Sequence, residues 1–300
     1  MKKLFCTLLS AAAAVALLCG FTPSPQENSA GAGLITKTYE TAEAISSLSV
    51  SDKYADVTVK ADDVDHVVVE YSYNSSYNDA FGTGGELYSF TIAGPSLNIQ
   101  GLKGDASMSV NNSKCICTMT VKLPRRAFAG LTVDTSNGNL TIQDMTSQSN
   151  TLTTTNGNIS ITGGSLDNLN ATANNGKVEV NNLLTQTFAA STRNGRISLA
   201  NTSALSITAQ AQNGSINLDT VSAPSYRCTV TNSSVVGKLV GRASDYAFDL
   251  TPGNGRVTVT DNTDSSFSLR SSGPVQQGQG AAQNFTAKAS NGSVNLEFLG

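Results

Sequence analysis

The sequence has a single histidine, no tryptophan and few charged residues, and these shortages already exclude several classes of function. With His66 as the only imidazole, multi-histidine metal sites are excluded and His-based catalytic triads have one candidate. Charged side chains make up 14% of the 300 residues, the formal net charge is −3, and no block of lysine or arginine occurs. A nucleic-acid partner is therefore not expected. Phosphate-loop, EF-hand and calcium-roll motifs are absent as well, so we expect no metal and no cofactor.

Cysteine is also scarce. Cys6 and Cys19 belong to the apolar N-terminal segment, which leaves three further cysteines, an odd number that argues against a disulfide framework. Cys115 and Cys117 fall on one face of a strand with Met119, Val121 and Leu123, and Cys228 falls on an apolar position of the repeat described below. We expect these three to be buried thiols.

The N-terminus has the order of charges and apolar residues that is typical of a bacterial export signal. Two lysines precede a largely apolar run that ends at Leu18, and Cys19 follows directly. We assign residues 1–19 to the signal and the Pro/Ser/Gly-rich residues 20–34 to a flexible tether. The segment resembles a lipoprotein signal, which implies acylation of Cys19, although Leu18 stands where such signals have Gly, Ala or Ser. Ordinary cleavage and a retained anchor are the alternatives.

A repeat of constant length fills residues 131–300. An asparagine before a sharp turn, most often in Asn-Gly, returns every nineteen residues, then once after twenty-two, with Gly273 and Asn291 continuing the series. Apolar residues alternate with polar ones on both sides of each turn, which predicts two strands with one buried face each. The equally spaced asparagines are Asn137, Asn156, Asn175, Asn194, Asn213 and Asn232.

Constant spacing favours stacked coils over hairpins. Asn-Gly suits a hairpin turn or a solenoid corner, since both can use left-handed residues. Only stacked coils, about 4.8 Å apart, need every corner to lie over the one below. We therefore predict an all-β, single-domain β-solenoid, with a barrel or sandwich of hairpins as the alternative. The first five of these asparagines, from Asn137 to Asn213, would then form a structural ladder along the turns. A third apolar position is expected to close each coil, at Met145, Leu166, Leu184, Leu205 and Val221.

Residues 35–130 contain further alternating strands of less regular spacing, which we expect to begin the solenoid and cap its open end. Here an alternating strand ends in Leu123-Pro124 and is followed by Leu131, Val133 and Thr135, and then by Asn137-Gly138. Over roughly residues 45–298 this order resembles the bacterial repeat family named for putative adhesins. The resemblance implies a β-solenoid at the bacterial envelope, sometimes linked to envelope-stress systems. It carries over no functional residues.

Two surface features are candidates for ligand binding. Lys177, Arg193 and Arg196 flank the turns of adjacent coils and could meet an anionic wall polymer by charge. The second feature mixes aromatic and small polar residues, as recognition loops do. Its tyrosines are Tyr71, Tyr73, Tyr77 and Tyr88. A solubilising corner and a loop whose tyrosines merely pack are the plainer readings of these two features.

The residues favour binding over catalysis. A glycoside hydrolase on this scaffold would need paired carboxylates, whereas Glu179 and Asp219 stand isolated among Ser, Thr, Asn and Gln. We therefore expect an exported, envelope-tethered or secreted protein without enzymatic activity, acting as a surface adhesion or scaffold protein. Its expected partner is a cell-wall polymer, a glycan or an envelope protein, with membrane attachment through Cys19 if that residue is acylated. A sensory accessory of an envelope-stress system and a carbohydrate-active enzyme are the alternatives.

Overall fold

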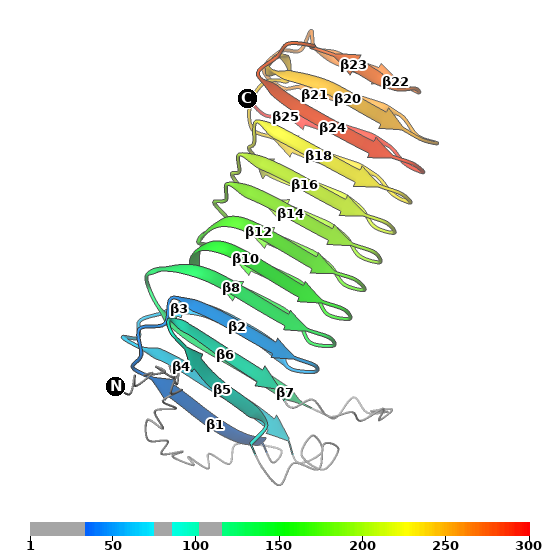
Figure 1. Cartoon of the computed structure of the whole chain (residues 1–300). Coiled ribbons are helices and arrows are strands. Elements are labelled where there is room, and N and C mark those ends of the chain that lie inside the picture. The colour runs from blue at the N-terminus through cyan, green and yellow to red at the C-terminus, as the bar shows by residue number, and fades with distance from the viewer. Residues whose placement is uncertain (1–33, 75–85, 102–115) are drawn as a thin grey trace, which may run out of the picture.

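The computed structural model describes residues 34–74, 86–101 and 116–300, and in these ranges it is a two-sheet β-solenoid (Figure 1). A 13-stranded sheet, here sheet A, faces a 12-stranded sheet, here sheet B. In spatial order sheet A contains β1 (Leu34–Thr41), β4 (Val67–Asn74), β7 (Cys117–Pro124), β3 (Asp56–Asp62), β9 (Leu140–Gln143), β11 (Ile159–Thr162), β13 (Val178–Asn181), β15 (Ile197–Ala200), β17 (Ile216–Val221), β19 (Val235–Leu239), β25 (Val294–Phe298), β21 (Val257–Asp261) and β22 (Ser268–Ser271). Sheet B contains β23 (Val275–Gln277), β20 (Tyr246–Pro252), β24 (Gln283–Ala289), β18 (Ser225–Val230), β16 (Ser206–Ala211), β14 (Thr187–Thr192), β12 (Ser165–Ala173), β10 (Thr146–Thr154), β8 (Ala127–Thr135), β2 (Ser47–Asp52), β6 (Ser96–Gly101) and β5 (Tyr88–Ala93). One 3-10 turn, η1 (Ala243–Asp245), precedes β20.

Each central coil consists of one strand of sheet B, the asparagine turn, one strand of sheet A and a return connection. Neighbouring coils pair in parallel, so that Thr172 lies opposite Ser191 in sheet B and Val178 opposite Ile197 in sheet A, and the register shifts once, between Asp219 and Val221 where β17 pairs with β19. The partners are nineteen residues apart, which is the repeat length seen in the sequence. The prediction of stacked coils is confirmed, and the hairpin alternative is wrong for the repeats.

The core is a column of aliphatic and aromatic side chains between the two sheets. The residue three positions after each turn asparagine is completely buried in every central coil. Cys117 and Cys228 are buried and belong to the core. Burial raises the pKa of the Cys228 thiol to about 12. Cys115 lies outside the described residues. The aliphatic members of this column are Leu140, Ile159, Val178, Ile197, Ile216 and Val235.

The asparagine corner is built differently from the expectation. Neither the turn asparagines nor the glycines that follow them have a positive φ among the described residues. The glycine is required by close approach instead, because a Cβ on Gly195 would lie 1.9 Å from the carbonyl oxygen of Gly176 in the coil below. Left-handed residues occur at the opposite corner, seven positions after each of the five markers from Asn137 to Asn213, and there Asn201 has φ 47° and Thr220 has φ 56°. The second of these is costly, because a β-branched residue rarely adopts this conformation.

The return connection adds a short third ladder, in which Ser165, Leu184, Ser203 and Ser222 pair in parallel. Met145, Leu166 and Val221 are buried as expected. The inward assignment of Leu184 and Leu205 is wrong, since their side chains are 60% and 63% exposed. In these two coils the residue after the left-handed corner residue, Leu183 or Thr202, points inward. The inward-outward alternation is therefore shifted by one residue, and both leucines point outward.

Stacking order departs from chain order at both ends of the rod. The coil β24–β25 inserts between β18–β19 and β20–β21, and the coil β6–β7 lies outside β2–β3. Reversed strands follow at each end, with β4 and β5 at one end and β22 and β23 at the other, all antiparallel to their neighbours. At the first end β1 pairs antiparallel to β4 and forms the edge of sheet A. Gly273 lies in the connection between β22 and β23, so its assignment as a coil marker is wrong.

An asparagine occupies a core position that is apolar in the adjoining coils. Asn150 is buried in register between Leu131 and Leu169 of the adjoining coils. Its amide nitrogen donates to the carbonyl oxygens of Ser147, at 3.2 Å, and Asn168, at 3.3 Å. Its Oδ1 and the nearby Ser147 Oγ have no hydrogen-bond partner. Burying an unsatisfied polar atom opposes folding.

We predict that Asn150→Leu raises the free energy of unfolding by about 1 kcal/mol, because it removes the unsatisfied oxygen and continues the apolar column. Urea unfolding followed by circular dichroism measures the change. Asn170→Leu, on the exposed side of the neighbouring strand, serves as the control and should leave stability unchanged. A loss of stability in Asn150→Leu would show that the two amide hydrogen bonds outweigh the unsatisfied oxygen.

Candidate interaction surface

A ladder of asparagine side chains runs along one corner of the rod. Each amide nitrogen donates to the Oδ1 of the asparagine in the coil below, at 2.7 to 3.0 Å. At the lower end Asn137 donates to the carbonyl oxygen of Lys53 at 3.2 Å. The order is Asn137, Asn156, Asn175, Asn194, Asn213, Asn232, Asn291 and Asn254, which contains all five predicted members. Because neighbours use most of its amide groups, the ladder is a structural element first.

A second polar row lies two residues further along each turn. Asp56 Oδ1 accepts hydrogen bonds from the backbone and side-chain nitrogens of Asn139, at 2.7 and 3.0 Å. Asn139 Oδ1 accepts the same pair from Asn158, and Asn158 Oδ1 accepts the backbone N–H of Lys177 at 3.0 Å. This row ties the coil β2–β3 to the regular repeats.

The three basic residues predicted as a patch lie at this corner, but two of them form ion pairs with the same glutamate. Glu179 pairs with Lys177 Nζ at 2.9 Å and with Arg196 Nη2 at 3.3 Å. The hydrogen bond from Lys177, together with the charges of both cations, lowers the pKa of Glu179. Arg193 is exposed, and no ion pair to it occurs in the described part of the chain. The patch is therefore weaker as an anion site than its sequence indicates.

The tyrosines predicted as a recognition loop are mostly core residues. Tyr71 and Tyr73 point inward from β4, Tyr88 begins β5, and their exposed fractions are only 3%, 4% and 4%. The Tyr71 and Tyr88 rings meet edge to face at 4.8 Å, Tyr71 donates to Glu86 at 3.1 Å, and burial raises the Tyr71 pKa. The expectation of an exposed loop is wrong for these three residues. Tyr77 lies outside the described residues.

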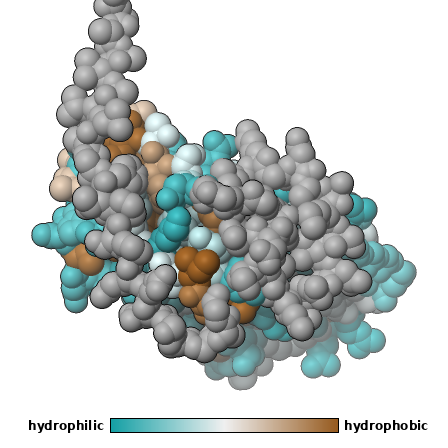
Figure 2. Space-filling model, turned by 90° about the horizontal axis from the view of Figure 1, so that it is seen from below, coloured by the Kyte–Doolittle hydropathy of each residue, from teal (hydrophilic) through white to brown (hydrophobic). Residues whose placement is uncertain are grey.

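These aromatic residues fill the space between the sheets at the N-terminal end of the rod. Tyr39 of β1 stacks on Phe90 of β5 with ring centroids 4.1 Å apart, and so joins the two edge strands. Figure 2 views the molecule from this end, where hydrophobic and hydrophilic residues lie interspersed on its described surface. The tyrosine-rich sequence thus supplies a cap for the core.

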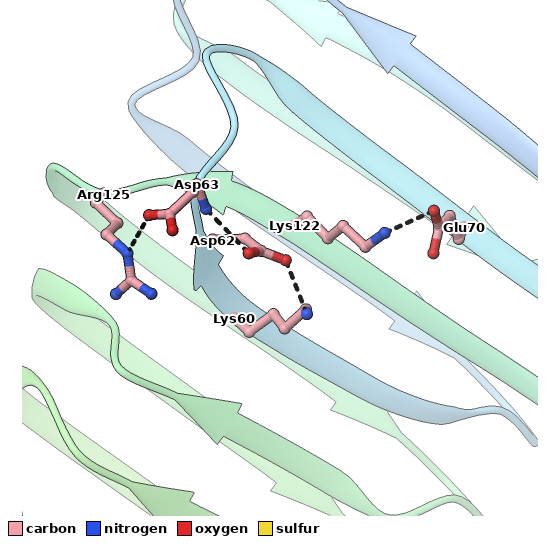
Figure 3. Close-up of polar contacts among 6 residues, drawn as sticks. All are labelled: Lys60, Asp62, Asp63, Glu70, Lys122 and Arg125. Atoms are coloured by element: carbon pink, nitrogen blue, oxygen red, sulfur yellow. Dashed lines mark hydrogen bonds and ion pairs between the residues drawn. The ribbon is translucent and has the colours of Figure 1, made fainter.

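A cluster of ion pairs on β3, β4 and β7 was not predicted from the sequence. Lys60 contacts Asp62 at 2.8 Å, Arg125 contacts Asp63 at 2.8 Å, and Lys122 contacts Glu70 at 2.6 Å (Figure 3). Lys60 and Asp62 are near neighbours on β3, whereas the pairing of β7 with β3 and β4 brings the partners of the other two ion pairs together. Each carboxylate has a cationic partner, so the cluster offers no free acid pair for catalysis.

The geometry also gives no support to the hydrolase alternative. Glu179 and Asp219 lie two coils apart and in different columns of sheet A, because Glu179 aligns with Ser198 and Asn217 while Asp219 aligns with Ala200 and Asn181. The lowered pKa of Glu179 is the reverse of what a general acid needs. Within the described ranges, no group of three or more His, Cys, Asp or Glu side chains could hold a metal ion.

The second corner carries a shallow hollow that the sequence did not indicate. Asn182, Asn201 and Thr220 line it, together with exposed Leu184 and Ser203. The hollow combines amide and hydroxyl groups with one apolar wall. It is open to solvent and contains no titratable side chain, so it offers contact and not chemistry.

The only imidazole lies between two acids at the edge of the cap. His66 Nδ1 contacts Asp65, and Nε2 lies 3.5 Å from a carboxylate oxygen of Glu40 in β1. The hydrogen bond with Asp65, with a smaller contribution from Glu40, raises the pKa of His66 above its ordinary value of 6.5. When it is protonated, the imidazole links Glu40 of β1 to the start of β4.

Comparison with known proteins assigns the family. Residues 45–297 match the profile of the family described as Toastrack DUF4097. The chain belongs to the Toastrack DUF4097 family. None of the curated proteins matches it. Within the described residues, no helix of this Toastrack chain is long and apolar enough to cross a membrane.

Several solved structures resemble the Toastrack chain. A protein from Parabacteroides distasonis named a putative lipid binding protein aligns with TM-score 0.48 and 12% identity over 89% of this chain and 97% of its own. A putative adhesin from Bacteroides fragilis gives 0.44 and 13%, and one from Parabacteroides merdae gives 0.42 and 14%, each over 89% of this chain and 97% of its own. The family assignment rests on the sequence profile and not on these structural similarities.

We predict that Asn194→Ala lowers the free energy of unfolding by about 1 kcal/mol, because Asn194 both donates to Asn175 and accepts from Asn213. Asn254→Ala is the matched control at the end of the ladder, where Asn254 donates only to Asn291. Thermal and urea unfolding should show a smaller loss for the end variant. Equal losses would mean that the ladder does not act through its inter-coil hydrogen bonds.

We also predict that His66 titrates above pH 6.5 in the folded protein, which NMR can follow without ambiguity because the chain has one histidine. Asp65→Asn should lower this pKa more than Glu40→Gln does. Since the folded pKa is the higher one, the stabilisation is fully present below pH 6.5 and is lost as the pH rises through the folded pKa. A folded pKa at or below 6.5 would contradict the arrangement.

Proposed function

We propose that the protein is an exported, envelope-tethered rod that acts as a non-catalytic surface interaction protein. The observation that carries the proposal is the long stack of coils with polar side chains in fixed outward columns and, among the described residues, no convergent catalytic or metal-binding group. A surface of this kind presents many similar contacts and no reaction centre.

The position of the N-terminal segment supports attachment at one end of the rod. Leu34 begins β1, the edge strand of sheet A, and the reversed strands β22 and β23 close the opposite end (Figure 1). If Cys19 is acylated, residues 20–33 link the lipid to this edge. The rod would then project from the membrane surface with its faces accessible to wall polymer, glycan or another envelope protein.

We predict that the full chain, expressed in a bacterial host, is found in the membrane fraction, and that Cys19→Ser moves it into the medium or the periplasm. Cys6→Ser, within the same apolar segment, should leave the protein with the membrane. The purified protein should also bind isolated cell-wall material saturably without releasing reducing ends.

The outcomes separate the alternatives. Reducing-end release that copurifies with the protein would favour a carbohydrate-active enzyme over the proposal. Membrane association that survives Cys19→Ser would overturn lipid tethering. Failure to bind wall material, with stable co-isolation of one membrane protein, would favour a sensory accessory instead.

A further inference from the structure

The outward face of sheet B differs in charge from the rest of the rod. Over β10, β12, β14 and β16 it is formed by every second residue of 149–153, 168–172, 187–191 and 206–210, which we call the neutral face. These positions hold Ser, Thr, Asn and Gln with a single Ala, and none is charged or aromatic. The nearest acid on these strands, Asp167, comes directly before Asn168 at the return-connection end of β12 and lies outside the neutral face. In the same coils the outward face of sheet A contains Glu179 and Asp219. A surface selected only for solubility would carry charges on both faces.

Hydrogen bonds between coils hold several side chains of the neutral face in place. Thr187 donates to Asn168 Oδ1 at 2.9 Å, the hydroxyls of Thr172 and Ser191 lie 3.2 Å apart, and Asn168 donates to the carbonyl oxygen of Gln148 at 3.1 Å. Threonine, serine and asparagine are also short side chains. Little side-chain entropy is therefore lost when a ligand contacts them.

From this chemistry we infer that the neutral face binds a neutral polysaccharide lying along the rod. The inference rests on the proposed function and specifies its ligand. Hydroxyl and amide groups both donate and accept hydrogen bonds, as the hydroxyls of an uncharged sugar do. An anionic wall polymer would gain no Coulomb attraction here, and a lipid or hydrophobic protein would find no large apolar side chain to bury.

The register of the coils explains how weak contacts become sufficient. Thr151, Asn170 and Ala189 lie in one column, and Thr208 continues it, with about 4.8 Å between coils. An extended polymer can contact several coils at once, and each contact raises the effective concentration for the next. Short oligosaccharides should therefore bind far more weakly than long chains.

The test measures binding of the purified full-length protein to insoluble cellulose, chitin and β-1,3-glucan and, by affinity electrophoresis, to soluble dextran and mannan. Polygalacturonate is the anionic comparison, and isolated cell-wall material is included. The variant Thr151→Lys with Ala189→Lys places two charges two coils apart on the neutral face. Thr162→Lys with Ala200→Lys is the matched control on sheet A, with the same residue types and spacing. Thr151→Val, which removes one hydroxyl and adds no charge, is a milder second variant, and circular dichroism checks that each variant is folded.

We expect at least one neutral polysaccharide to bind, with a loss of tenfold or more in the neutral-face variant, a smaller loss in Thr151→Val and no change in the sheet A control. Binding to polygalacturonate alone, or equal losses in both lysine variants, would overturn the inference. Binding to cell-wall material that is insensitive to the neutral-face variant would overturn it while leaving the proposed function intact. Absence of binding to every probe would count against both.

Discussion

The structure depends on each pair of neighbouring coils forming parallel hydrogen-bond ladders in both sheets at once. Strands in a sheet lie about 4.8 Å apart, so every coil must rise by that amount and return to the same place in both sheets. A nineteen-residue coil satisfies both ladders, and an inserted residue would displace one of them. The corner shows how tight this condition is, because the backbone at Gly195 passes so close to Gly176 that no side chain fits between them. The asparagine ladder then ties each corner to the next.

This constraint also determines what the surface can do. Outward side chains of successive coils fall into straight columns, so a change in composition along one face extends over many coils. In the central coils sheet A carries Glu179 and Asp219 on its outward face, whereas the neutral face of sheet B is uncharged and has Asp167 beside it on β12. A protein of this form presents extended, repetitive surfaces and not a single cavity. Such surfaces suit elongated or multivalent partners, because many weak contacts act together.

The sequence was sufficient to predict the repeats and their core, because alternation and constant spacing are local properties. It was not sufficient where the result depends on which strand lies beside which. Tyr71 and Tyr73 were predicted as loop residues because the sequence does not show that β7 and β5 pack against them. Leu184 and Leu205 were predicted to point inward because the alternation was continued through the corner. The corner shifts the alternation by one residue, so both side chains point outward. Asn-Gly indicated a left-handed turn, whereas the glycine serves close packing. The ion pairs of Lys122 and Arg125 likewise need the long-range pairing of β7 with β4 and β3.

Coil order is the strongest example of this limit. Tyr226 stacks on Phe285 at 4.7 Å, but chain order would have placed Phe248 on Tyr226, an equally apolar neighbour. The most direct test uses cysteine pairs, because a disulfide needs Cα atoms within about 7 Å. The account predicts that Ser225→Cys with Asn284→Cys forms a disulfide, since these residues are paired in β18 and β24, whereas Ser225→Cys with Ala247→Cys, two coils apart, does not. Efficient cross-linking of the second pair and not the first would contradict the stacking order.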